Sequence, residues 1–210
     1  WLDSRFDYVC FLDSDDPLLP GKLSRERELL ARHPEKGFTY GHKVVFDEQS
    51  RQTFRRPVAA SGNPEDFAIE HFLTNEAKCS AVLYRAAIIK GRRFREDLRY
   101  NEDSDFLQRI ALENDGIYEP EPGCWIRWHL GSKSRNALEI QRAVLKASQD
   151  ILVDYPEFYE RHRARVDARL KRIQKDLFVE MMVAGLWDEA QACSTTLAEK
   201  LLASSRMGIL

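Results

Sequence analysis

The sequence YVCFLDSDD, from Tyr8 to Asp16, places an unbroken apolar run directly before three carboxylates. Apolar residues at every position, rather than at every second one, are typical of a strand with both faces covered, at the centre of a parallel sheet between helices. Ligands bind at the carboxyl ends of such strands. Because crowded carboxylates repel one another, we expect Asp13 and Asp15 to hold a cation there.

Other structures also place acidic residues after a strand, and the sequence separates them in part. Asp and Ser are good turn and N-cap residues, so a simple acidic turn before the next helix stays open. An EF-hand loop starting at Asp13 is excluded, because it needs Gly and Glu where the chain has Leu18 and Ser24. A phosphatase of the haloacid dehalogenase type normally has Thr or Val after its DxD, whereas this chain has Asp16 and Pro17.

Composition limits the class of protein. With 210 residues, 43% hydrophobic and 31% charged, the chain can bury a core as one domain with an appendage. A formal net charge of -2 gives no overall attraction to nucleic acid, so none is expected as a partner. No stretch approaches the roughly 18 consecutive apolar residues of a membrane helix. The cysteines show no CxxC spacing, which indicates free thiols in a reducing, cytoplasmic compartment: Cys10, Cys79, Cys124 and Cys193.

Helices and strands are expected to alternate up to residue 136, with only helices beyond Ala137. Residues 51–62 read as an irregular surface excursion. Asn63 and Asn101 are the expected N-caps. Because the chain starts at Trp1 and enters a strand at once, we expect it to be a fragment that lacks upstream strands. The expected helices are 22–33, 64–73, 101–113 and 187–202, and the expected strands are 37–46, 80–84 and 124–130.

Three segments of the chain resemble, in order and spacing, the later part of a family 2 glycosyltransferase with the GT-A fold. They read FLDSDDPLLPGKL, FREDLRYNEDSDFLQRIAL and WIRWHLGSKSRN, and the match covers about Asp7 to Asn136. Each segment is a weak signal alone, and the ordered trio is specific. The resemblance implies an α/β fold: residues 1–136 form a partial GT-A, Rossmann-like sheet flanked by helices, without its N-terminal nucleotide-binding strands, and 137–210 form a helical extension.

The same resemblance implies the chemistry of metal-dependent, inverting sugar transfer. Asp13 and Asp15 would hold Mg²⁺ or Mn²⁺ and the diphosphate of a nucleotide sugar, with a UDP-sugar expected. Asp103 would be the catalytic base, with Glu102 beside it, and would activate a hydroxyl of a saccharide, lipid-linked or protein-glycan acceptor. Physical chemistry agrees, because the departing diphosphate needs a cation and the attacking hydroxyl needs a base. An alternative explanation is that Glu102 and Asp103 only stabilise the helix, because negative charges at its N-terminus interact favourably with the helix dipole.

Further residues have two interpretations each. His129 would ligate the metal or touch the diphosphate, or else be a packed, hydrogen-bonded residue. Lys133 and Arg135 would bind phosphates, or else lie in a solvated loop. Arg109 would contact substrate, or else form a salt bridge within its helix. Asp16 is expected to have a structural or acceptor-side role.

The helical extension carries no motif of its own. Its basic stretch, residues 161–175, is interrupted by Asp167 and reads first as a solvated face, with peripheral contact to an anionic membrane surface or a polymer as the minority alternative. The alternative function is a non-catalytic binding or scaffold fragment with a helical association tail. As a spatial prediction, the Asp103 carboxylate should face the same cleft as Asp13 and Asp15.

Overall fold

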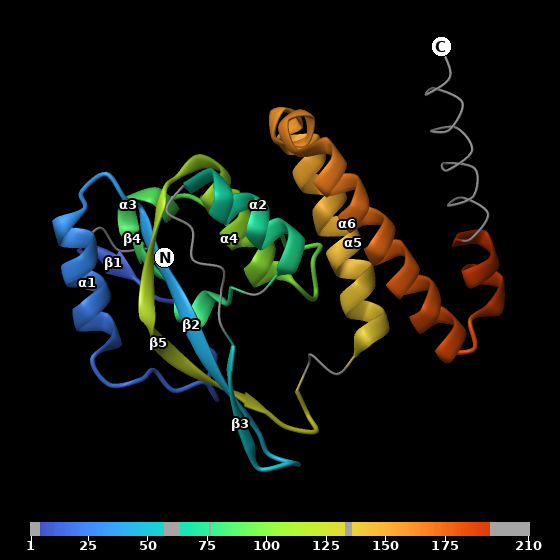
Figure 1. The fold of residues 1–210 in the computed structure, drawn as a ribbon, viewed down its shortest axis with the longest axis horizontal. Helices are drawn as coiled ribbons and strands as arrows, with labels where there is room; N and C mark the ends of the chain where they lie inside the picture. Colours follow the sequence, from blue (N-terminus) through green and yellow to red (C-terminus); the bar gives the residue numbers. More distant parts are fainter. Residues whose placement is uncertain (1–4, 57–63, 76, 133–135, 194–210) are drawn as a thin grey trace. The chain divides into compact units, whose positions relative to one another are not determined.

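A computed structural model describes residues 5–56, 64–75, 77–132 and 136–193. The chain divides into two compact units, Trp1–Ser132 and Lys133–Leu210. The first unit is α/β, with a mixed five-stranded sheet flanked by helices, and the described part of the second is helical (Figure 1). The α/β class with a helical C-terminal part is therefore as predicted.

The strand β2 is central to the sheet. Its more extensive antiparallel pairing is with β3. The parallel strand β5 pairs along the whole of β2, while β4 and β3 pair with its first and last residues. Since a strand has two edges, β4 and β3 share the edge opposite β5. The strand β1 then pairs antiparallel with β4. The strands are β1 (Tyr8–Val9), β2 (Phe38–Asp47), β3 (Gln52–Arg56), β4 (Leu83–Arg85) and β5 (Gly116–Trp128).

Helices cover both faces of this sheet. The helix α1 lies on one side, and α2 and α4 lie on the other (Figure 1). An aromatic core fills the space under α2 and α4, where Phe38, Phe67 and Tyr84 are fully or almost fully buried. The apolar spacing of α4 predicts a buried stripe, and its four members are all buried: Phe106, Leu107, Ile110 and Ala111. The helices of this unit are α1 (Lys22–Arg32), α2 (Pro64–Thr74), α3 (Ala86–Ile89) and α4 (Glu102–Glu113), with a 3₁₀ turn, η1 (Cys79–Ala81).

The strand before the three carboxylates differs from the prediction. It was expected to be a buried central strand of a parallel sheet, but β1 has two residues, which are half-buried, and pairs antiparallel with one neighbour among the described strands. The rest of the apolar run serves other contacts. Phe11 packs edge-on against Phe94 and Phe106, whereas Leu12 is 51% exposed. The apolar residues from Tyr8 to Leu12 therefore reflect side-chain packing more than a long strand with many backbone hydrogen bonds.

Two further strand predictions need correction. Residues 51–62 were expected to be irregular, yet β3 forms a hairpin with the end of β2. The polar composition of QTFRR hid this strand, in which the side chains of Gln52, Thr53 and Phe54 are all exposed. The strand expected over 124–130 is the second half of β5, which begins at Gly116 and passes through Pro120 and Pro122. Those prolines made its first half read as a loop.

The helix predictions hold in place but differ in capping. Asn101 precedes α4 as expected, yet its side chain makes no capping hydrogen bond and its φ of 63° is left-handed. Asn63 lies outside the described residues. Of the last expected helix, residues 187–193 are helical in the described part.

The second unit contains α5 (Ala137–Asp154) and α6 (Pro156–Val183), joined at Tyr155. The two helices pack against one another. The apolar spacing predicts one face on each helix, and six of the eight predicted members are buried: Val144, Ala147, Ile151, Val166, Ile173 and Leu177. Ile140 and Leu170 are half-buried. Across the described ranges, no helix has the length and apolar character needed to cross a membrane.

Candidate functional site

The acidic turn, which we define as Asp13 to Asp16, follows β1 and leads towards α1. The Asp16 amide donates to the Asp13 carbonyl at 3.2 Å, which closes the turn. The side chains of Asp13 and Asp15 are exposed, whereas Asp16 is only 6% exposed. The Asp16 Oδ1 accepts a hydrogen bond from the Arg127 amide at 3.0 Å, so this carboxylate ties the turn to β5. The structural role expected for Asp16 is therefore visible, while the side chains of Asp13 and Asp15 reach solvent.

Burial makes the Asp16 carboxyl a weaker acid than usual. Loss of solvent raises the pKa of its carboxyl to about 6, and the negative charges of Asp13 and Asp15 act in the same direction. The hydrogen bond from Arg127 and the positive charge of Lys78 oppose this shift. A cation bound at the turn would relieve the same repulsion, which is one physical reason for expecting one there.

His129 lies beside the acidic turn, although more than a hundred positions separate the two in sequence. Its Nε2 is 3.3 Å from the Asp15 Oδ2. The Gly131 amide donates to His129 Nδ1 at 3.1 Å, so the ring of the neutral imidazole carries its hydrogen on Nε2 and donates it to Asp15. Direct metal ligation through Nε2 would need the opposite tautomer and the loss of the Gly131 bond. In this geometry His129 orients Asp15.

The second acidic group lies at the start of α4. The Asp103 Oδ1 accepts from the Ser104 amide at 2.8 Å, and its Oδ2 lies 4.0 Å from the Lys78 Nζ. The Asp103 side chain is 33% exposed, and Glu102 is half-buried. Asp103 thus keeps solvent contact while one of its oxygens is fixed, as a general base requires.

A hydrogen-bond network holds the N-terminus of α4 in place. Asn75 and Asn101 both have left-handed backbones, with φ of 55° and 63°, and the Asn75 Nδ2 donates to the Asn101 Oδ1 at 2.8 Å. Ser104 Oγ donates to Asn75 Oδ1. The buried His71 has its Nε2 3.2 Å from the Ser104 carbonyl, and burial lowers the pKa of His71 to about 4, so the ring is neutral at pH 7. This network replaces the side-chain cap that Asn101 was expected to provide.

Arg109 is part of a buried ion-pair cluster in the same helix. Its Nε lies 2.9 Å from the Asp105 Oδ2, and the Arg95 Nε lies 3.1 Å from the other Asp105 oxygen. Arg109 also donates to the Arg93 carbonyl at 2.9 Å. Of the two interpretations of Arg109, the structure shows the salt bridge. Asp105, whose side chain is fully buried, is an architectural residue that the sequence did not distinguish from its acidic neighbours.

Both acidic groups interact electrostatically with one short segment, Lys78–Cys79, at the start of η1. Lys78 pairs with Asp103, and its charge also acts on the Asp16 carboxyl. The Cys79 Sγ donates to the Asp103 carbonyl at 3.2 Å. Burial raises the pKa of the Cys79 thiol, and the charges of Asp103 and Asp13 both add to that shift. The charges of Asp103 and of the acidic turn therefore both reach this segment, and a common cleft for Asp103, Asp13 and Asp15 stays a prediction.

Lys78 was missed in the sequence. The signal was slight: one lysine inside the apolar stretch AKCSAVL, between α2 and β4, where a charged residue needs an ionic partner. Lys133 and Arg135, which were expected to bind phosphates, lie outside the described residues.

Metal binding can be judged from the donors present. Throughout residues 5–56, 64–75, 77–132 and 136–193, no three His, Cys, Asp or Glu side chains converge as a metal-binding group. Mg²⁺ usually keeps several waters and is held by one or two carboxylates together with substrate phosphates, without an all-protein cage. The exposed carboxylates of Asp13 and Asp15 fit this arrangement of one or two carboxylates with substrate phosphates. A cation here would need the diphosphate as a co-ligand.

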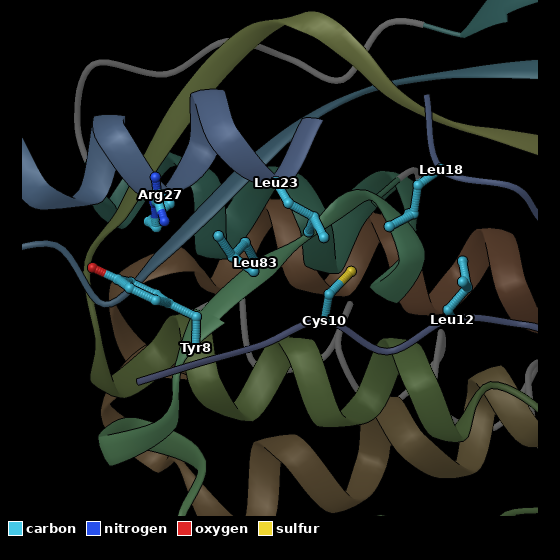
Figure 2. Close-up of a pocket in the computed structure, with 7 residues that line it drawn as sticks. All are labelled: Tyr8, Cys10, Leu12, Leu18, Leu23, Arg27 and Leu83. Atoms are coloured by element: carbon cyan, nitrogen blue, oxygen red, sulfur yellow. The ribbon is translucent and has the colours of Figure 1, made fainter. Parts of the chain in front are cut away.

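An apolar cavity of about 330 Å³ lies beside β1 and α1. Figure 2 shows its lining, with Leu12 and Leu18 at one end, Arg27 and Tyr8 at the other, and Cys10, Leu23 and Leu83 between them. None of the carboxylates of the acidic turn belongs to this lining. The cavity is therefore separate from the candidate acid–base and metal-binding residues.

Comparison with models of known protein families and with curated proteins gave no match. The expected family therefore depends on the three sequence segments. In the structure, these segments supply the acidic turn, the start of α4 and His129, in that order.

Proposed function

We propose that this chain belongs to a metal-dependent, inverting glycosyltransferase of family 2 with a GT-A, Rossmann-like fold. It would transfer a sugar from a nucleotide sugar, with a UDP-sugar expected, to a hydroxyl acceptor. One observation carries the proposal: the acidic turn and Asp103, about ninety positions apart in sequence, both act on the segment Lys78–Cys79. This supports the proposal, which needs a cation-binding pair and a solvent-accessible base within reach of one donor.

Each side chain would have a distinct task. Asp13 and Asp15 would hold Mg²⁺ or Mn²⁺ together with the donor diphosphate, and the cation would neutralise charge on the departing diphosphate. His129 would keep Asp15 in position through the 3.3 Å contact. Asp103 would accept the proton of the acceptor hydroxyl, and Glu102 would support the local negative potential.

The test is a transfer assay on the full protein that contains this chain. Nucleoside diphosphate release from a panel of nucleotide sugars is measured with Mn²⁺, with and without saccharide acceptors. We expect release that requires both Mn²⁺ and acceptor and that is lost in Asp15→Ala. Asp115→Asn is the matched control, because Asp115 is exposed and pairs with Lys36 before β5 begins. Absence of metal-dependent release with every donor, or full activity of Asp15→Ala, would contradict the proposal.

A further inference from the structure

Lys78 has a cationic side chain that its neighbours satisfy only in part. Its Nζ lies 4.0 Å from the Asp103 Oδ2, which is too long for a hydrogen bond. Within the described part of the chain, the structure gives Lys78 no hydrogen bond. An ammonium group has three donors, so this one is held near Asp103 by charge while its donors remain available.

The Lys78–Asp103 ion pair is also easy to exchange. The Lys78 side chain is 39% exposed and the Asp103 side chain 33% exposed, and solvent screening makes ion pairs with this exposure weak. A phosphate group carries more charge than a carboxylate and offers several acceptor oxygens. A phosphate at this site would therefore compete successfully for the ammonium.

The location of Lys78 matches that competition. Its Nζ lies 4.0 Å from the Asp103 carboxylate, and its charge also acts on Asp16 in the acidic turn, so the ammonium is within electrostatic reach of both acidic groups. The flexible four-carbon stem of lysine lets the ammonium change partner without movement of the backbone.

We propose that Lys78 binds the diphosphate of the donor, and that this contact releases the Asp103 carboxylate for the acceptor hydroxyl. The proposal rests on the function proposed above and adds a phosphate-binding residue and an order of binding. The donor binds first, because Asp103 is paired with Lys78 until a phosphate oxygen replaces it. Lys78 thus couples the two halves of the site.

Calorimetry with a preformed complex of Mn²⁺ and inorganic pyrophosphate tests this directly. One charge-assisted hydrogen bond contributes about 1.5 to 3 kcal/mol, so Lys78→Met should bind the complex about 10- to 150-fold more weakly. Lys78→Arg should retain most of the affinity, since the cation remains. Lys36→Met is the matched control, because Lys36 also forms one long ion pair, at 3.4 Å to Asp115, and should bind like the parent.

A second measurement separates exchange from simple electrostatics. If Asp103 competes for Lys78, Asp103→Asn should tighten pyrophosphate binding several-fold, and the gain should largely disappear in a Lys78→Met background. Equal binding by Lys78→Met and the parent, or a gain from Asp103→Asn that is independent of Lys78, would overturn the role of Lys78 and leave the proposed function intact. Failure of the parent protein to bind the complex would instead contradict the proposed function.

Discussion

The acidic turn and the start of α4 are built alike but stabilised differently. Each has exposed or half-exposed carboxylates and one that is buried: Asp16 in the turn and Asp105 in the helix. Asp105 is paired with two guanidinium groups, whereas the Asp16 carboxylate accepts from a backbone amide and has two like charges nearby. Ion pairs therefore compensate the burial of Asp105, whereas one backbone hydrogen bond and the more distant charge of Lys78 only partly compensate the burial of Asp16.

The largest expected effect concerns a carboxylate that stays accessible. Asp103→Asn should lower sugar transfer by roughly 10² to 10⁴, because a general base acts in the transition state. Stability should change by only about 0.3 to 1 kcal/mol, from the lost dipole interaction. Steady-state transfer, measured with donor affinity, checks this. Glu102→Gln should lose less activity, and the assignment of the base is wrong if that order is reversed.

The next effect concerns the buried carboxylate of α4. Asp105→Ala should cost about 3 to 5 kcal/mol of unfolding free energy, because it leaves Arg95 and Arg109 without their shared partner. Urea unfolding measures it. Asp115→Ala is the control, since its exposed pair with Lys36 should contribute less than about 1 kcal/mol. Similar losses in the two variants would remove the distinction between architectural and accessible carboxylates.

The smallest effect concerns the buried carboxylate of the turn. Because the pKa of Asp16 is raised to about 6 in the folded protein, folding favours its protonated form. The unfolding free energy should therefore fall as the pH rises from about 4 to about 6, by about 1 to 3 kcal/mol, and then level off.

The difference between parent and Asp16→Asn isolates this contribution, because asparagine keeps the acceptor oxygen and does not ionise. Asp16→Asn should lack that part of the pH dependence, while Asp15→Asn, at an exposed position, should keep it. An identical pH profile for the parent and Asp16→Asn would show that burial of Asp16 imposes no electrostatic cost.

Much of the fold could be read from the sequence where side-chain periodicity determines it. The stripe of α4, the helix that begins at Lys22 and the start of β2 all follow from apolar spacing. The hairpin strand β3 and the first half of β5 could not be read, because a polar face and two prolines obscure them. Nor could the short, antiparallel β1, since an apolar run does not specify which backbone groups pair.

The site was predictable in its residue types but not in its connections. Motif order named Asp15, Asp103 and His129, yet the tautomer that makes His129 a donor to Asp15 depends on the Gly131 amide. Lys78 can be recognised as a candidate site residue only from its distance to Asp103 in the structure. Contacts between segments this far apart in sequence depend on tertiary packing, which the local patterns of a single sequence do not reveal.

The central claim is that a cation held with a diphosphate lies at the acidic turn, next to the base. The most direct test is the NMR spectrum of the labelled protein as Mn²⁺ and pyrophosphate are added, because paramagnetic broadening falls steeply with distance. We expect the strongest broadening at residues 13–16 and 129, weaker broadening at Lys78, Cys79 and Asp103, and its loss in Asp15→Ala. Broadening confined to other acidic surfaces, such as Glu157 to Glu160 in α6, or unchanged in Asp15→Ala, would contradict the account.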